Sequence, residues 1–176
     1  MQTAQDLRLH AFALSGHSHR VELFLTLLRL DFERLEVDLT HGQHKQPTFL
    51  AKNALGQVPV LEDGTLTLAD SNAILVYLAA RYDSQGSWQP REPEAQGRVQ
   101  RWLSLAAGQL AMGAASARLA RLFGAQLDLP RAHAIAGQLL SLMLTKSPFL
   151  AGKAPTLADL SLYSYTAVAP EGGISL

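Results

Sequence analysis

Cysteine is absent from this chain of 176 residues. The absence excludes disulfide bridges, zinc sites built on thiolates, and any mechanism in which a protein thiol is the nucleophile. Sulfur chemistry in this protein would have to use a thiol that a ligand brings. His10, His41 and His133 show no metal-ligand spacing with one another or with carboxylates, so we expect no metal.

An excess of charge of either sign is also absent, because 15 lysine and arginine residues balance 15 aspartate and glutamate residues. Without a basic field, the chain has no general means of holding nucleic acid or an anionic membrane surface. The longest uncharged stretch, residues 102–117, includes Ser104 and Gln109 and falls short of the ~18 apolar residues that a spanning helix needs. Charged residues interrupt the first twenty positions, unlike a signal peptide. We therefore expect a cytoplasmic protein with no nucleic acid and no membrane as partners.

The first half of the chain alternates strand and helix patterns. Residues 7–14 predict a strand that ends at a Ser15-Gly16 turn, and a helical apolar pattern follows, for which Ser18 is the predicted cap. The alternation over residues 34–39 predicts a second strand, parallel to the first if a right-handed crossover joins them.

A hairpin and a third helix complete this half. A short helix is predicted around Phe49, and Asp63-Gly64 between two apolar segments is a strong hairpin signal. Asp70-Ser71 then begins a helix. The order βαβαββα is the thioredoxin-like arrangement, and we expect this α/β domain to occupy residues 1–82.

The second half is predicted to be entirely helical. Residues 83–92 have little periodicity and predict a linker to an all-α domain over residues 93–176. Helices are predicted from Pro93 through an apolar stripe around Trp102, over residues 115–123 and 130–144, and from Thr156, where Asp159 can complete a capping box. The stripe is expected to lie in the core, and His133 is expected to be structural.

Three stretches in this order resemble the glutathione transferase family: SGHSHRV at 15–21, NALGQVPVL at 53–61 and DSNAILVYL at 70–78. The position of His44 within Gly42-Gln43-His44 resembles the theta-type branch, in which a histidine lies at this place. Residues 155–159 resemble the family's C-terminal folding motif. The resemblance implies a cytosolic homodimer that binds glutathione as cosubstrate and transfers it to a small electrophilic substrate.

The resemblance also implies how the middle of glutathione is held. The Val58-Pro59 bond would be cis, so that the Val58 backbone pairs with the cysteinyl part like an added strand, beside Gln57. His44 would face the glycine end. From the residues alone, Pro59 is equally compatible with an edge strand that binds nothing, and His44 and Lys45 with solvated loop side chains.

The remaining implied contacts lie at two helix starts. Ser71, as a helix cap, would seat the γ-glutamyl carboxylate and Asp70 would pair with the ammonium, although both also suit a plain cap. Ser15 would donate to the sulfur and favour the thiolate. Ser18 and His17 are alternative sulfur contacts, but Ser18 is more simply a cap and His17 a solvent-facing histidine.

Two other functions stay open on sequence grounds. A disulfide reductase that uses two bound glutathiones requires no protein cysteine, and the same fold serves non-catalytic binding proteins. After the helix from Thr156 the family usually continues through at least one more helix, whereas this sequence stops at Leu176. Either the sequence is a truncated one or the protein lacks that wall of the electrophile pocket. We therefore expect a shallow electrophile pocket and weak, unselective activity.

Overall fold

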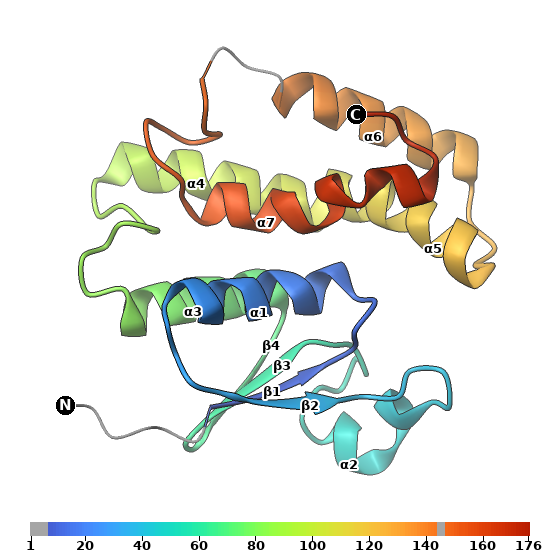
Figure 1. The fold of residues 1–176 in the computed structure, drawn as a ribbon, viewed down its shortest axis with the longest axis horizontal. Helices are drawn as coiled ribbons and strands as arrows, with labels where there is room; N and C mark the ends of the chain where they lie inside the picture. Colours follow the sequence, from blue (N-terminus) through green and yellow to red (C-terminus); the bar gives the residue numbers. More distant parts are fainter. Residues whose placement is uncertain (1–6, 144–146) are drawn as a thin grey trace. The chain divides into compact units, whose positions relative to one another are not determined.

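The computed structural model of the chain describes residues 7–143 and 147–176 (Figure 1). The chain divides into two compact units, residues 1–84 and 85–176. The division falls inside the predicted linker at residues 83–92. Residues 1–6 of the predicted first domain and the predicted helix end at Leu144 lie outside the described residues.

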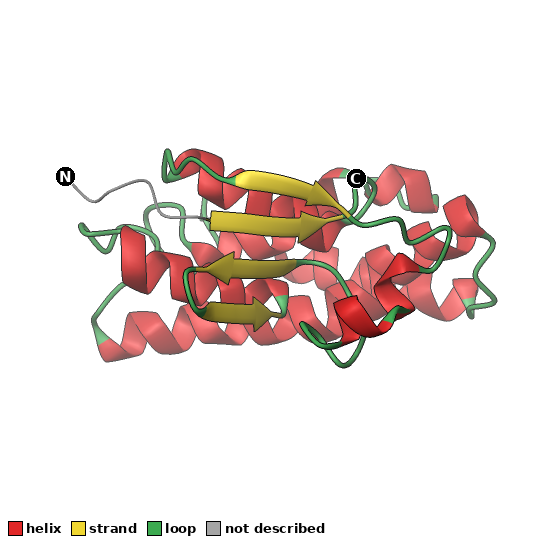
Figure 2. Cartoon of the chain, turned by 90° about the horizontal axis from the view of Figure 1, so that it is seen from below, coloured by secondary structure: helices red, strands yellow, loops and turns green. Residues whose placement is uncertain are grey.

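The first unit contains one four-stranded mixed sheet in the order β2-β1-β3-β4 (Figure 2). Strand β1 is parallel to β2 and antiparallel to β3, and β3 is antiparallel to β4. Helices α1 and α3 cover one face of the sheet and α2 lies on the other (Figure 1). The predicted thioredoxin-like arrangement is confirmed. Its elements are β1 (Leu7–Ala11), α1 (Gly16–Leu27), β2 (Glu33–Glu36), the 3-10 turn η1 (Gln43–Lys45), α2 (Pro47–Leu50), β3 (Val60–Asp63), β4 (Leu66–Ala69) and α3 (Ser71–Tyr82).

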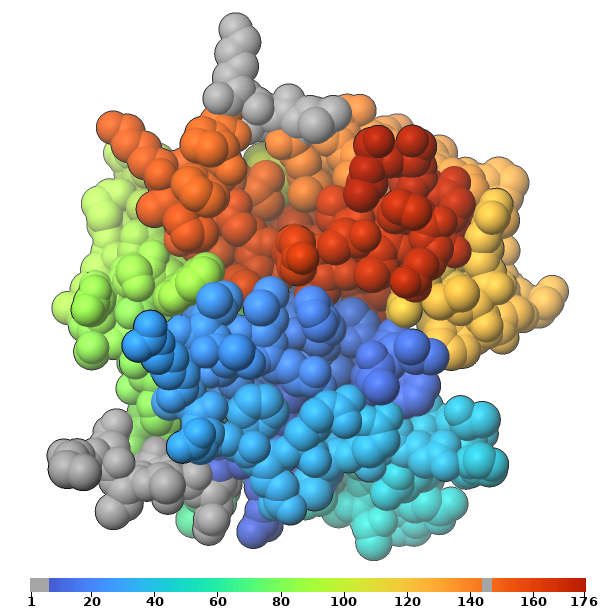
Figure 3. Space-filling view, viewed as in Figure 1, coloured from blue at the N-terminus to red at the C-terminus, as the bar shows by residue number. Residues whose placement is uncertain are grey.

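Apolar periodicity explains how these elements pack. Alternate residues of β1 are buried, as are the apolar positions at helical spacing on α1 and α3. A smaller core cluster consists of Val37, Phe49 and Val60, with Val58 packed against it. In the space-filling view, the residues from α1 to α2 (blue to cyan) form most of the visible surface of this unit (Figure 3).

The start of α1 differs from the prediction. The Ser15 N–H donates to the Phe12 carbonyl at 2.9 Å, so the chain turns there and β1 ends at Ala11 rather than at residue 14. The helix then begins at Gly16 with Ser15 as its N-cap, and Ser15 Oγ accepts the Ser18 N–H. The prediction that Ser18 is the cap is therefore wrong.

The second unit is helical throughout its regular elements. The predicted stripe is buried, and Trp102 is 5% exposed with its indole N–H donating to the Leu150 carbonyl at 2.9 Å. The helices predicted as separate before and after residue 115 are continuous, because a π-helical segment joins them. The predicted Thr156–Asp159 capping box is confirmed. The elements are α4 (Pro93–Leu105), the π-helix η2 (Ala106–Ala115), α5 (Ser116–Phe123), α6 (Leu129–Met143), α7 (Leu157–Ala167) and the 3-10 helix η3 (Ala169–Gly172).

Across the two described ranges, no helix has both the length and the apolar character that crossing a membrane requires.

Candidate functional site

The sheet register gathers the predicted site residues at one end of the first unit. Ala11 at the end of β1 pairs with Glu36 at the end of β2, and Val60 at the start of β3 lies opposite both His10 of β1 and Ala69 of β4. The segments that follow β1, β2 and β4, and the one that precedes β3, therefore share this end of the sheet, where α/β sheets commonly meet ligands. These segments carry all the predicted site residues: Ser15, His44, Gln57, Val58, Pro59, Asp70 and Ser71.

The backbone of Val58 is available for pairing. The Val58-Pro59 bond is cis, as the resemblance implies. The Val58 side chain packs against the Val37 cluster, while its backbone N–H and C=O make no hydrogen bond within the described part of the chain. Gln57 is exposed, and its carbonyl accepts from Asn53 Nδ2 at 2.8 Å. An unpaired N–H and C=O on one residue is what an extended peptide needs in order to add as a strand.

Asp70, not Ser71, caps α3. Asp70 Oδ1 accepts the Ala73 N–H at 2.8 Å, and Ser71 is the first helical residue. This corrects the prediction of Ser71 as the cap, and it makes the Ser71 N–H one of the first backbone donors of the helix. Asp70 has φ 72 and ψ 119, a conformation that costs a non-glycine residue about 1–3 kcal/mol and that clusters at functional sites.

Ser15 and Ser18 differ in what their hydroxyls can reach. Ser15 is half-buried and its Oγ accepts the Ser18 N–H at 3.2 Å, but no acceptor among the described residues takes its hydroxyl hydrogen. Ser18 is 0% exposed, and its Oγ accepts the Phe12 N–H at 3.2 Å. Ser15 is therefore the serine of this pair that can donate to a ligand.

His17 does not face solvent, so that prediction is wrong. Its ring is half-buried, and Nδ1 lies 3.2 Å from Ser71 Oγ. Burial, and then the positive charge of Arg20, lower the pKa of His17 to about 4, with Asp70 acting in the opposite direction. The imidazole is consequently neutral at physiological pH.

Arg20 is a residue of this site that sequence reasoning missed. It is fully buried, and Nη1 donates to Ser71 Oγ at 3.3 Å and to Asn72 Oδ1 at 2.8 Å. A charged residue within the apolar helical pattern that follows Ser15 was the available signal. Its partners lie 51 and 52 positions away in the chain, so the pairing itself could not be read from the sequence.

The loop with His44 lies against the segment that leads to Val58. Lys45 is exposed, and its Nζ donates to the carbonyls of Leu55 and Gly56 at 3.1 and 3.2 Å, so it joins the two segments. A Cβ on Gly56, whose φ is 58, would lie 2.7 Å from the His44 carbonyl. Within the described residues, His44 Nδ1 is buried and has no hydrogen-bond partner. A buried polar atom of this kind is a candidate ligand contact.

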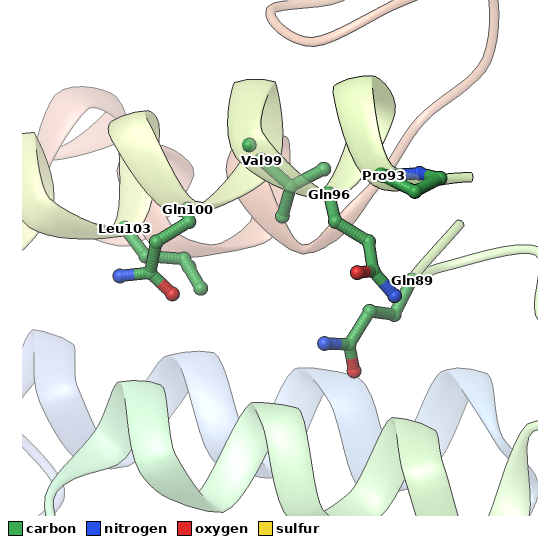
Figure 4. Close-up of a pocket in the computed structure, with 7 residues that line it drawn as sticks. Gln89, Pro93, Gln96, Val99, Gln100 and Leu103 are labelled. Atoms are coloured by element: carbon green, nitrogen blue, oxygen red, sulfur yellow. The ribbon is translucent and has the colours of Figure 1, made fainter. Parts of the chain in front are cut away.

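The second unit has a pocket of ≈ 350 Å³ along α4 (Figure 4). Its side chains come from three glutamines, Gln89, Gln96 and Gln100, together with Pro93, Val99 and Leu103. Trp102 is not among the lining residues, because it packs in the core. Among residues 7–143 and 147–176, no group of three or more His, Asp or Glu side chains could hold a metal ion.

Comparisons with known proteins identify the family. Residues 6–80 match the family profile of the glutathione S-transferase N-terminal domain. Human glutathione S-transferase theta-2 is 34% identical over 165 residues, which cover 88% of this chain and 68% of that protein. The chain belongs to the glutathione transferase family.

Solved structures of glutathione transferases share the fold of both units. A glutathione S-transferase from Pseudomonas fluorescens has a TM-score of 0.89 at 32% identity, over 97% of this chain and 87% of that one. Human theta-2, solved in complex with glutathione and an unknown ligand, has a TM-score of 0.83 at 31% identity, over 92% of this chain and 71% of its own. The predicted family and fold class are confirmed.

Proposed function

We propose that the sheet end described above binds glutathione as cosubstrate and that the chain transfers it to an electrophile. The observation that carries the proposal is the Val58 N–H and C=O, which have no hydrogen-bond partner among residues 7–143 and 147–176 and lie at the same sheet end as the start of α3 and the Ser15 hydroxyl. A thiol tripeptide with a carboxylate at each end matches this set of groups. The glutathione bound to human theta-2 supports the same assignment.

Each end of the tripeptide has matching groups in the site. The γ-glutamyl carboxylate fits the start of α3, where Ser71 offers its N–H group and the helix dipole favours an anion. The exposed Asp70 carboxylate is the partner for the ammonium. At the other end, buried His44 Nδ1 is the group for the glycine carboxylate, with Gln57 exposed beside the cysteinyl contact.

Ser15 is the proposed catalytic residue. A thiol with a pKa near 8.5 is about 3% ionised at pH 7, and lowering the pKa by about 2 units requires about 2.7 kcal/mol. A hydrogen bond to a charged group contributes about 1.5–3 kcal/mol and a helix N-terminus about 0.3–1 kcal/mol. The Ser15 hydroxyl at the N-terminus of α1 combines the two effects.

The reaction follows from that thiolate. The sulfur uses an electron pair to form a bond to an electrophilic carbon, and the bond to the leaving group breaks with its electrons. The chain contains no cysteine, so the nucleophile belongs to the cosubstrate, and the protein contributes position and electrostatics. As the resemblance implies, we further propose that the protein is cytoplasmic and acts as a homodimer. Sedimentation velocity tests the homodimer.

The test compares Ser15→Ala with Ser15→Thr, which keeps a hydroxyl. With an aromatic halide as electrophile, we expect Ser15→Ala to keep glutathione affinity within a few fold, to raise the pKa in the pH profile of the rate, and to lower turnover about tenfold or more. Ser15→Thr should retain part of the activity. Ser18→Ala is the control, and it should lower stability without moving the pH profile. A pH profile that shifts in Ser18→Ala and not in Ser15→Ala would show that Ser18, and not Ser15, contacts the sulfur.

The same preparations distinguish the other functions. A disulfide substrate turned over in place of the aromatic halide would indicate the reductase, and glutathione binding without turnover of either substrate would indicate a binding protein.

A further inference from the structure

Two side chains from α1 contact the hydroxyl of Ser71. Arg20 Nη1 lies 3.3 Å from Ser71 Oγ, and His17 Nδ1 lies 3.2 Å from it. A serine hydroxyl has one hydrogen to donate and two lone pairs that accept. Because a guanidinium only donates, Arg20 occupies one lone pair. The hydrogen and the other lone pair remain for His17 and for a ligand.

The His17 ring can face this hydroxyl in two ways. A neutral imidazole carries its hydrogen on one nitrogen and accepts at the other. With the hydrogen on Nε2, Nδ1 accepts from Ser71 and uses the hydroxyl hydrogen. With the hydrogen on Nδ1, the ring donates to Ser71 and leaves the hydroxyl hydrogen free. Burial keeps His17 neutral, since its pKa is lowered to about 4, so these two tautomers are the states available at pH 7.

A carboxylate at the start of α3 discriminates between the two states. Hydrogen bonds to an ionised acceptor are roughly twice as strong as those between neutral groups. A bound carboxylate therefore draws the Ser71 hydroxyl hydrogen away from His17. Nδ1 would then present a lone pair to the Ser71 oxygen unless it carries a hydrogen itself.

We infer that His17 is a positioning residue for the proposed glutathione site. In the free protein His17 Nδ1 accepts a hydrogen bond from the Ser71 hydroxyl, and once the γ-glutamyl carboxylate is bound it donates one to the Ser71 oxygen. The hydrogen leaves Nε2 and one arrives at Nδ1 by exchange with water, so the charge of the ring does not change. In the bound state Ser71 accepts from both Arg20 and His17, and its own hydrogen points to the carboxylate. This inference rests on the proposed function.

The test follows the histidine tautomers by 15N NMR at pH 7 in the wild-type protein. We expect His17 to change from the Nε2–H to the Nδ1–H form on saturation with glutathione, with its signals assigned by their loss in His17→Asn. His133 is the internal control, because its Nε2 lies 2.9 Å from the Gly172 carbonyl and must carry the hydrogen in both states. The tripeptide γ-aminobutyryl-cysteinyl-glycine, which lacks the γ-glutamyl carboxylate, should leave the His17 tautomer unchanged.

Two variants test the consequence for affinity. An asparagine amide can either donate or accept from a position close to Nδ1, so His17→Asn should keep glutathione affinity within about threefold. His17→Phe should weaken it about tenfold, a loss of about 1.4 kcal/mol. Glutathione binding by the wild-type protein with no change of the His17 tautomer would overturn the inference alone. Calorimetry that detects no glutathione binding to the wild-type protein would overturn the proposed function, and this inference with it.

Discussion

Asp70 combines two roles in one side chain. Its Oδ1 caps α3 through the Ala73 N–H, while the exposed carboxylate supplies the negative charge that the proposed ammonium contact needs. The backbone conformation at φ 72 holds that carboxylate at the helix start. Asparagine is also a good N-cap and tolerates positive φ, so capping and charge can be separated by one substitution.

We predict that Asp70→Asn weakens glutathione affinity about tenfold, the loss of about 1.4 kcal/mol expected when one charged partner of an ion pair is removed. Thermal stability should stay within about 0.5 kcal/mol, because the cap is kept. The matched control is Asp128→Asn, which alters another aspartate that accepts a helix-start N–H, that of Arg131 at 3.0 Å. Calorimetry that gives equal affinity for Asp70→Asn and Asp128→Asn would contradict the ammonium contact.

In the second unit, η2 and α6 pack closely against each other at Gly113. A Cβ built there would lie 2.8 Å from the backbone nitrogen of Ala136 and 3.0 Å from its Cα. Because backbone atoms of a helix cannot move aside as a flexible side chain can, the crossing requires glycine at this position.

We therefore expect Gly113→Ala to lower the free energy of unfolding by about 1–3 kcal/mol, as overpacking typically does. Gly137→Ala, one residue beyond Ala136 in α6 with open space around its Cβ position, should instead raise it by up to about 1 kcal/mol through helix propensity. Urea unfolding of both variants measures the difference. Equal effects would show that the close crossing contributes nothing to stability.

In the first unit, α3 is tied to the hairpin through Asp63. Tyr77 and Tyr82 both donate to Asp63 Oδ2 at 2.6 Å, from positions about 1.4 turns apart on the helix. Burial, followed by the hydrogen bond to the Asp63 carboxylate, raises the pKa of each tyrosine to about 12. The hairpin turn and the C-terminal part of α3 are therefore joined through neutral hydroxyls.

This geometry predicts a loss of stability at high pH. The folded pKa lies above the ordinary value near 10, so the contribution is complete below pH 10 and is lost as the pH rises towards 12. Unfolding free energies measured in urea at pH 9, 10 and 11 should fall progressively in the wild-type protein. The double variant Tyr77→Phe/Tyr82→Phe should show a smaller fall over the same range, and parallel curves would count against the pairing.

For the molecule as a whole, a ligand that binds only the folded state must raise the free energy of unfolding. A ligand at a hundred times its Kd adds about 2.7 kcal/mol to the free energy of unfolding. For a chain of this size, that corresponds to a rise in Tm of about 5–10 °C. We expect this rise in calorimetry at saturating glutathione, and a smaller one at the same concentration in Asp70→Asn. No rise at any millimolar concentration would contradict glutathione binding.

Much of the fold could be predicted because its signals are local. The Asp63-Gly64 hairpin, the Thr156–Asp159 capping box and the buried stripe around Trp102 each depend on residues within a few turns of one another. The continuity of the helix through residues 106–115 was missed, because Gly108 and Gly113 have low helix propensity, whereas packing against α6 holds the segment helical. The segments that carry the proposed site residues were also predictable, since they are the turns between predicted elements.

Which atoms face one another in the site was decided by the packing of α1 against α3 over the sheet. That packing buries Ser18 and Arg20 and brings His17 to Ser71, a residue 54 positions away. A motif records that a serine or a histidine is present, but its exposure and its hydrogen-bond partner depend on elements distant in the chain. The order of the elements therefore followed from local propensity and periodicity, whereas the protonation and orientation of the groups at the site follow from long-range contacts.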